Sequence, residues 1–134
     1  MRETPAADDV ATTPVPERAW WLAFMQVPRI GPARIRGLLD HFGSLRAAWG
    51  ESGSELRKAV PAGVLEDLLR IRGELDVRAL YERTTRDGVR ITCWADDDYP
   101  ALLREVPAPP PLLYYRGQLV ETDTTAVAIV GTRK

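Results

Sequence analysis

Apolar positions in the first two-thirds of the chain recur at the spacing of amphipathic helices. A first helix is expected to open at Pro16 and to stop before Pro28, because proline suits the first turn of a helix and disfavours helical conformation in the residue before it. A second is expected to begin at Gly31 and to end at Gly43. Its apolar face follows the i, i+3, i+4, i+7 pattern and consists of Ile35, Leu38, Leu39 and Phe42.

Further helix signals continue to residue 85. Ser44 is placed to cap a short helix, and Ser52 and Glu55 have the spacing of a capping box. A longer helical stretch follows over residues 63–85, and Gly73 is expected to bend or break it. These elements predict a helical domain over residues 16–86 that folds without the rest of the chain.

The aromatic residues of this domain have two interpretations. Exposed aromatic side chains stack on nucleic-acid bases, whereas the helical spacing found here favours burial. The expected core consists of Trp20, Trp21, Phe24, Ile35, Leu38, Phe42 and Trp49.

After Gly88 the pattern changes to that of β-strands. Residues 89–94 and 112–117 are predicted strands, joined through a polar loop, a short helix after Pro100 and an extended proline-rich segment. A third strand is expected over residues 125–131, TAVAIVG, whose two faces are both apolar, as in a central parallel strand. The order of elements predicts an α+β protein, with residues 87–134 as the opening of an α/β unit.

Charge is unevenly distributed along the 134 residues. The formal net charge of −1 excludes the strongly basic composition of many nucleic-acid-binding chains. Residues 18–46 nevertheless carry five arginines and one acid, a net charge of +4. Residues 1–15 combine prolines, small residues and acids without an apolar period and are expected to be a disordered tail.

Two composition limits narrow the chemistry. The single cysteine, Cys93, excludes an internal disulfide and a multi-cysteine zinc site, and the single histidine, His41, leaves little for histidine-based catalysis. No apolar run is long enough to cross a membrane and the N-terminus does not resemble a signal peptide, so we expect a cytoplasmic protein.

The turn between the first two helices, residues 27–35, resembles a helix-hairpin-helix. In that motif the turn amides and a helix N-terminus hold one backbone phosphate. Arg29, Gly31, Arg34 and Arg36 are therefore candidate secondary DNA contacts, although Arg29 stands where the usual pattern has glycine. The alternative is a helical hairpin that only packs, with its arginines on a solvated face.

The C-terminal residues form a second candidate site. Gly131 permits an unusual turn, the Thr132 hydroxyl can cradle a phosphate, and Arg133 and Lys134 add positive charge. The run is neither a P-loop nor a dinucleotide-binding G-x-G-x-x-G. The acidic run of residues 96–98 is interpreted as a polar loop that caps the next helix rather than as a metal site.

Together these segments resemble the DNA-processing protein A family (DprA, also called Smf). The family shares a D-Y-P-x-x-L, P-P-x-L-x-x-x-G and V-A-I-V-G-T-R run, and the helical segment from residue 18 is also similar to it. The matching residues are Asp98, Tyr99, Pro100, Leu103, Pro110, Pro111, Leu113, Gly117 and residues 127–133.

The resemblance implies a helical domain of sterile-alpha-motif or helix-hairpin-helix type, followed by a Rossmann-like domain. It implies a protein that binds incoming single-stranded DNA in natural transformation, protects it and loads the RecA recombinase. Gly131, Thr132 and Arg133 would form the phosphate-binding loop of that protein. The resemblance implies no cofactor, no metal and no catalysis, and it implies that the full-length protein is a homodimer. We accordingly expect the chain to be the N-terminal part of a longer protein.

Two other functions stay open. A Rossmann-like enzyme could process a nucleotide, with residues 96–98 as its acids. Alternatively, residues 18–86 could be a protein-interaction module. If Arg34, Arg36 and Arg46 share one exposed patch, DNA contact is favoured, whereas pairing with carboxylates favours packing or protein contact.

Overall fold

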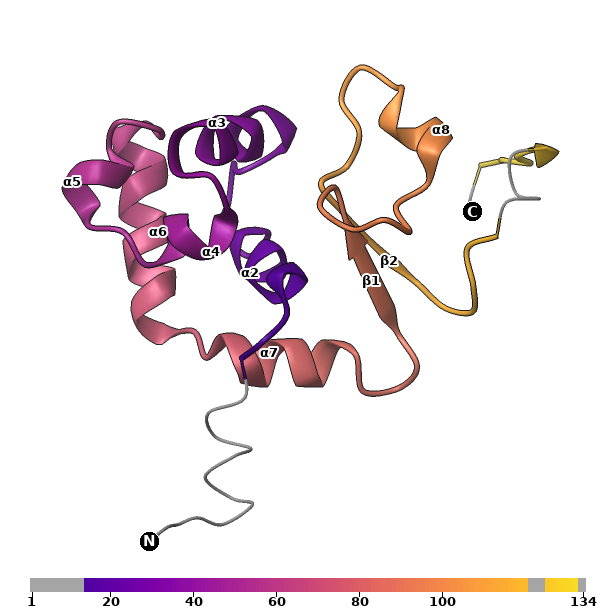
Figure 1. Cartoon of the computed structure of the whole chain (residues 1–134), viewed down its shortest axis with the longest axis horizontal. Helices are drawn as coiled ribbons and strands as arrows, with labels where there is room; N and C mark the ends of the chain where they lie inside the picture. The colour runs from indigo at the N-terminus through magenta and orange to yellow at the C-terminus, as the bar shows by residue number, and fades with distance from the viewer. Residues whose placement is uncertain (1–13, 121–124, 133–134) are drawn as a thin grey trace, which may run out of the picture.

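The computed structural model describes residues 14–120 and 125–132, so the predicted tail lies almost wholly outside the described residues. Helices make up most of the fold, and a small sheet lies to one side of them (Figure 1). The helices of the expected helical domain are α2 (Glu17–Phe24), α3 (Pro32–Phe42), α4 (Leu45–Trp49), α5 (Gly53–Leu56), α6 (Ala62–Glu74) and α7 (Val77–Thr84).

The local start and stop signals act as predicted, except that the Ser52 amide donates to Glu51 and not to the Glu55 side chain as a full capping box requires. Pro16 precedes α2, and Gly43 ends α3 with a φ of 88°, a left-handed conformation that favours glycine. The Ser44 side chain accepts a hydrogen bond from the Ala47 amide, and Ser52 accepts one from the Glu55 amide. Short-range chemistry therefore sets these helix ends.

The break in the long helical stretch was predicted at the wrong residue. Gly73 stays inside α6, and the chain leaves helical conformation at Leu75 and Asp76. The Asp76 side chain caps α7 by accepting a hydrogen bond from the Ala79 amide at 3.0 Å. A capping bond made at Asp76 outweighs the weak helix preference of Gly73.

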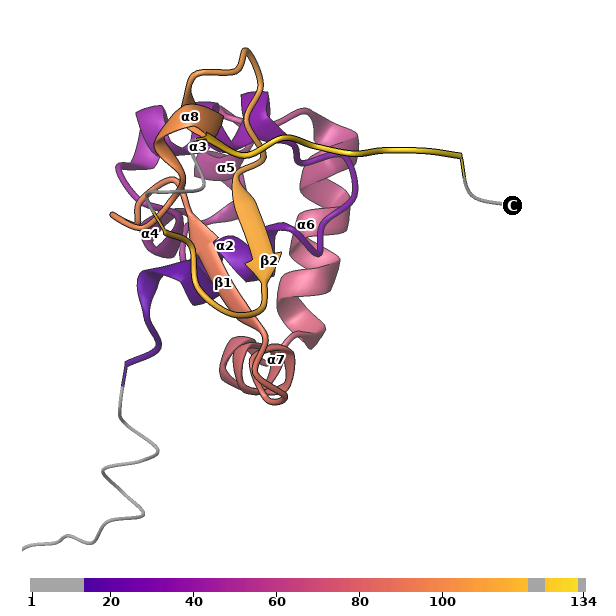
Figure 2. The ribbon, with the colours of Figure 1, turned by 90° about the vertical axis from the view of Figure 1, so that its right-hand side faces the viewer.

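The two strands form an antiparallel pair, β1 (Arg90–Cys93) and β2 (Leu112–Tyr115), and α8 (Ala101–Arg104) lies in their connection (Figure 2). Cys93 lies opposite Leu112, and all three of Ile91, Cys93 and Leu112 belong to the main core. The core therefore continues past residue 87, the expected domain boundary.

The predicted third strand is wrong for the structure described. Residues 126–132 form no strand, and Val127, Ile129 and Val130 are 85%, 94% and 91% exposed. A strand needs hydrogen-bonding neighbours as well as apolar side chains, and the sheet of the described residues consists of β1 and β2.

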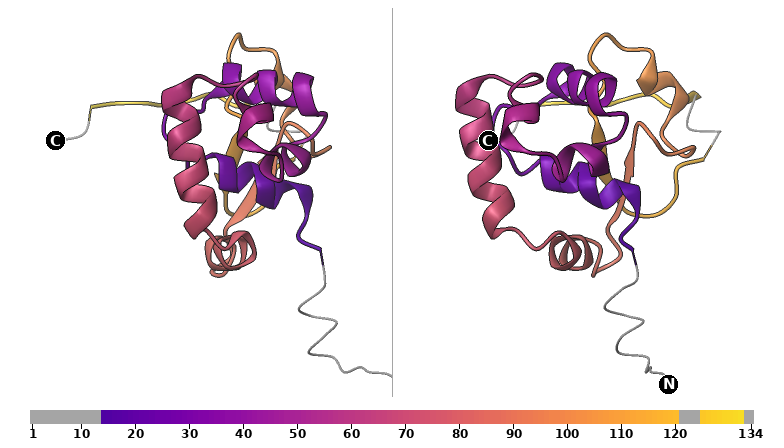
Figure 3. Two further views of the ribbon diagram at one scale, coloured as in Figure 1. Left: turned by 90° about the vertical axis from the view of Figure 1, so that its left-hand side faces the viewer. Right: turned by 60° about the vertical axis from the view of Figure 1, so that its left-hand side comes forward.

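The core is centred on α2, which lies between the other helices and the strands (Figure 3). Trp21, Phe24, Ile35, Leu38 and Trp49 are buried as expected. Trp20 and Phe42, by contrast, are only partly buried at the edge of this core. The prediction missed this difference because periodicity indicates the face of a helix on which a residue lies but not how deeply it is buried. None of the helices in the described part of the chain has the length and apolarity needed to span a membrane.

The depth difference between two phenylalanines is testable. Phe24 is fully buried and makes an edge-on contact with Trp49 at 5.1 Å, so Phe24→Ala is expected to lower the free energy of unfolding by about 3–5 kcal/mol. Phe42→Ala is expected to cost clearly less, because its side chain is partly solvated. Urea denaturation followed by circular dichroism measures both, and equal losses would contradict the assigned core.

Candidate nucleic-acid interface

The turn between α2 and α3 holds one of the two candidate sites. Val27 and Ile30 are buried and anchor the turn, which leaves Arg29 exposed at its tip. Arg29 has a φ of 69°, in the left-handed region that glycine adopts most readily. This backbone requirement explains why a hairpin of this type usually has glycine where Arg29 stands.

The N-terminus of α3 faces solvent without a capping side chain. Gly31 is its N-cap residue, Pro32 follows, and no acidic residue lies in the first turn. The first amide bonded within the helix is that of Ile35, which donates to the Gly31 carbonyl. The amides of Ala33 and Arg34 thus belong to the first turn, where the helix dipole favours an anion.

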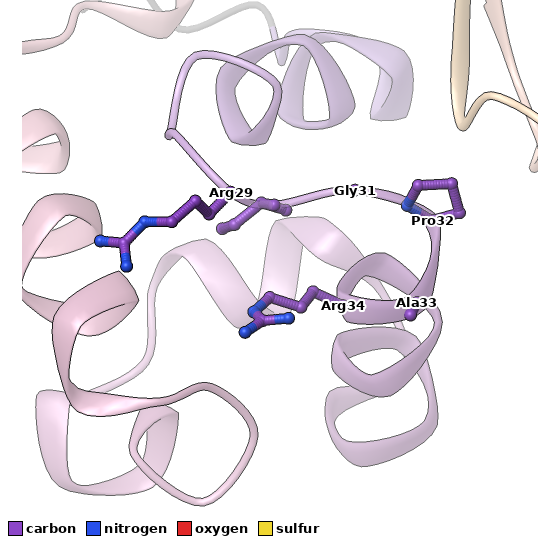
Figure 4. Close-up of a pocket in the computed structure, with 6 residues that line it drawn as sticks. Arg29, Gly31, Pro32, Ala33 and Arg34 are labelled. Atoms are coloured by element: carbon purple, nitrogen blue, oxygen red, sulfur yellow. The ribbon is translucent and has the colours of Figure 1, made fainter.

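An open pocket of about 440 Å³ lies on this turn and is lined by residues 29–34 (Figure 4). Figure 4 shows Arg29 and Arg34 extending toward the same side of the turn. The Nε atom of Arg34 is buried and has no hydrogen-bond partner in the described part of the chain. Two cationic side chains therefore border one pocket.

Arg29 is paired with a carboxylate from α6. Its guanidinium lies 3.1 Å from Asp67, which also binds Arg70 at 3.1 Å. Hydrogen bonding to Arg70, and then to Arg29, lowers the pKa of Asp67, so this carboxyl group is ionised at neutral pH. Sequence inspection missed Asp67, because 38 residues separate it from Arg29 and no local pattern links the two.

The other arginines of the basic segment do not join Arg34. The Arg36 guanidinium stacks over Trp94, 4.7 Å from the ring centre, beside a second pocket that includes Asp40 and Pro107. Arg46 lines a third pocket with Trp20 and Trp49. Arg34, Arg36 and Arg46 thus line three pockets, so the expectation of one shared exposed patch is not met. The carboxylate pair found beside this turn involves Arg29, which was not one of these three arginines.

The C-terminal candidate site is described only in part. Gly131 and Thr132 are exposed, and Arg133 and Lys134 lie outside the described residues. The phosphate-binding role of these four residues stays a prediction.

The acidic loop after β1 supports the local fold. Asp96 accepts a hydrogen bond from the Cys93 amide at 3.0 Å and lies 3.5 Å from Arg18 of α2. Asp98 accepts hydrogen bonds from the hydroxyls of Thr92 and Tyr115. These acids do not cap α8 as predicted, since no side chain caps that helix.

Tyr99 links the acidic loop after β1 to the proline-rich segment before β2. It is buried, and its hydroxyl donates to the Pro110 carbonyl at 2.7 Å. The acidic loop and the proline-rich segment are thereby fastened to each other. Within the described ranges, no group of three or more His, Cys, Asp or Glu is arranged to hold a metal ion.

Comparison with known proteins gives the class. The model of the DNA recombination-mediator protein A family matches residues 90–134, which include both strands and the C-terminal candidate site. Protein Smf of Synechocystis sp. is 35% identical over 123 residues, which cover 87% of this chain and 31% of that protein. No solved structure matches the chain significantly.

The aligned stretch is long enough to include most of the helical part, so the similarity to Protein Smf extends beyond the segment that the family model matches. The chain belongs to the DprA/Smf family of DNA-processing, recombination-mediator proteins. It spans about a third of the length of the curated relative it matches.

The backbone of Arg29 supplies a stability prediction. Arg29→Gly and Arg29→Ala both remove the exposed pair with Asp67, but only glycine relieves the left-handed backbone. The glycine variant is expected to be more stable than the alanine variant by about 1 kcal/mol, after allowance for the greater freedom of glycine in the unfolded chain. Thermal melts of the two variants measure this difference, and equal stabilities would contradict the assigned φ.

Cys93 supplies a pH prediction. Burial, the largest cause, raises the pKa of the Cys93 thiol to about 12 from an ordinary value of 9.0. A thiol-specific reagent at pH near 8 is expected to label Cys93 only as the protein unfolds, since the thiolate is the reactive form. The folded state favours the neutral thiol, so its contribution is complete below pH 9.0 and is lost as the pH rises toward about 12.

Cys93→Ala provides the control for this alkaline effect, because it removes the thiol and leaves the tyrosines in place. A smaller loss of stability between pH 9.0 and about 12 is expected in the variant. Rapid labelling of the folded wild-type protein would show that the thiol is accessible and would contradict its assigned burial.

Proposed function

We propose that this chain is the N-terminal part of a single-stranded-DNA-binding recombination mediator that catalyses no reaction. The observation that carries the proposal is the family match over residues 90–134, the segment that ends in Gly131, Thr132, Arg133 and Lys134. In this proposal the full-length protein covers incoming single-stranded DNA in natural transformation and loads RecA onto it. It acts in the cytoplasm as a homodimer.

The C-terminal candidate site is the main DNA contact in this proposal. A glycine, a hydroxyl and two cations suit a phosphate group, and arginine can bind two of its oxygens at once. Such a loop depends on the strand before it and the helix after it for preorganisation.

An enzymatic role is less well supported. Asp96 and Asp98, two of its three proposed acids, are already engaged with Cys93, Arg18, Thr92 and Tyr115. A protein-contact role for the helical part is the second candidate. The specific observation that favours it is the pairing of Arg29, in the α2–α3 turn, with Asp67 of α6, which engages one cation of the basic segment with a carboxylate.

The test compares residues 1–134 with the full-length protein, each with and without Arg133→Ala. Fluorescence titration with a single-stranded oligonucleotide at low and physiological salt is expected to show weak binding by residues 1–134, about 10⁻⁴–10⁻⁶ M or poorer. The substitution is expected to change little in the shorter chain and to weaken the full-length protein strongly. Arg83→Ala, which removes an exposed arginine on α7, is the charge-matched control.

Two outcomes would contradict this proposal. A full-length protein without salt-sensitive affinity for single-stranded DNA would exclude the DNA-binding function. Equal affinity of the short and full-length chains would place the main site in the helical domain and would contradict its assignment to residues 131–133.

A further inference from the structure

We propose that Arg29 and Arg34 form a second binding site for a DNA backbone phosphate, and that Asp67 occupies Arg29 until a phosphate displaces it. This inference rests on the proposed function, because it takes single-stranded DNA as the ligand. It concerns the pocket on the α2–α3 turn and is independent of Arg133.

Positive groups lie in the lining of this pocket and, through the Arg29 guanidinium, beside the first turn of α6. The first turns of α3 and α6 both contain no acidic residue, and neither helix has a side-chain cap. The Arg29 guanidinium rests against the first turn of α6, where a Cβ on Gly63 would lie 3.5 Å from its terminal nitrogens. Arg29 thus brings its charge close to the positive end of a second helix.

Arg34 has donor capacity that the described protein groups do not use. Its Nε atom is buried without a hydrogen-bond partner, although a buried N–H group is costly to leave unpaired. The Nε atom itself is closed to solvent, and it is the remainder of the Arg34 side chain that lines the open pocket. A phosphate oxygen is a charged acceptor of the kind that arginine binds well.

Asp67 is the only carboxylate for which the described residues give an ion pair with Arg29. The Arg29 side chain is 61% exposed and that of Asp67 is 24% exposed, so the pair is solvated and weakly held. Asp67 also keeps Arg70 as a partner when Arg29 leaves. Exchange of the carboxylate for a phosphate therefore leaves neither Arg29 nor Asp67 without an opposite charge.

In this arrangement Asp67 competes with DNA phosphate for Arg29. In the resting protein it cancels one of the two charges at the pocket, which keeps non-specific attraction low. A DNA strand that also engages the main site supplies phosphate at high local concentration, and the exchange then becomes favourable. The second site would add little alone and would strengthen binding by the full-length protein.

The experiment removes the negative charge of Asp67 from the chain of residues 1–134. Asp67→Asn is expected to raise affinity for a single-stranded oligothymidylate about threefold at low salt, and to increase the salt dependence by about one phosphate contact. Glu66→Gln is the matched control, since it removes one negative charge from the neighbouring exposed position of α6. It is expected to have a clearly smaller effect.

Double variants identify which arginine is released. Arg29→Ala in the Asp67→Asn background is expected to abolish the gain, whereas Arg70→Ala in that background is expected to preserve it. Arg34→Ala in the same background is expected to reduce the gain. Circular dichroism melts of each variant, recorded with the titrations, verify that a change in affinity occurs in folded protein.

Three results would overturn the inference: equal effects of Asp67→Asn and Glu66→Gln, a gain that survives Arg29→Ala, or a gain that requires Arg70. Its failure is distinguishable from failure of the proposed function. The full-length protein would still lose affinity on Arg133→Ala if only the second site were wrong, and the Asp67→Asn gain would persist if only the main site were wrong.

Discussion

Burial of α2 on almost every side is the constraint on which the rest of the structure depends. Ala19 and residues 21–24 are almost entirely buried, and α2 contacts α4, α7 and β1. Trp21 meets Trp94 from beyond the helical part with ring centres 5.8 Å apart, while Arg18 reaches the Ile91 carbonyl. A helix buried in this way cannot shift without disturbing both the helices and the hairpin. The turn that follows α2 is anchored in the same core by Val27 and Ile30, which places the backbone of Arg29 at its exposed tip.

Local signals in the sequence predicted the helix ends well. Gly43, Ser44 and Pro100 act within a few residues of themselves, so their roles follow from the order of the chain. The break between α6 and α7 was predicted at Gly73 and lies at Asp76, because the capping bond of Asp76 outweighs the weak helix preference of Gly73. Residues that form strands were recognised correctly at β1 and β2, where a partner strand exists. The prediction of a third strand failed over residues 126–132, because the pattern of apolar residues does not show whether a neighbouring strand is available for pairing.

The candidate sites were predicted less completely, for a physical reason. The turn and its arginines are adjacent in sequence and could be found by inspection. Their partners, Asp67 for Arg29 and Trp94 for Arg36, come from distant segments that only folding brings close. Charge counting gave a basic segment over residues 18–46, but it could not show that four of its five arginines would be divided among three pockets. The charge of the segment thus indicated nucleic acid as a possible partner, but it did not indicate which surface would contact it.

The exposed apolar segment at residues 126–130 also affects how this chain behaves in solution. AVAIV is uncharged, rich in β-branched residues and without proline, which is the composition that favours intermolecular strand pairing. Val127, Ile129 and Val130 are presented to solvent, with no shielding charge between them. Molecules of the isolated chain can therefore join through this segment while their helical parts remain folded. Self-association of this kind depends on protein concentration, so it is governed by the exposed apolar segment and not by the stability of the core.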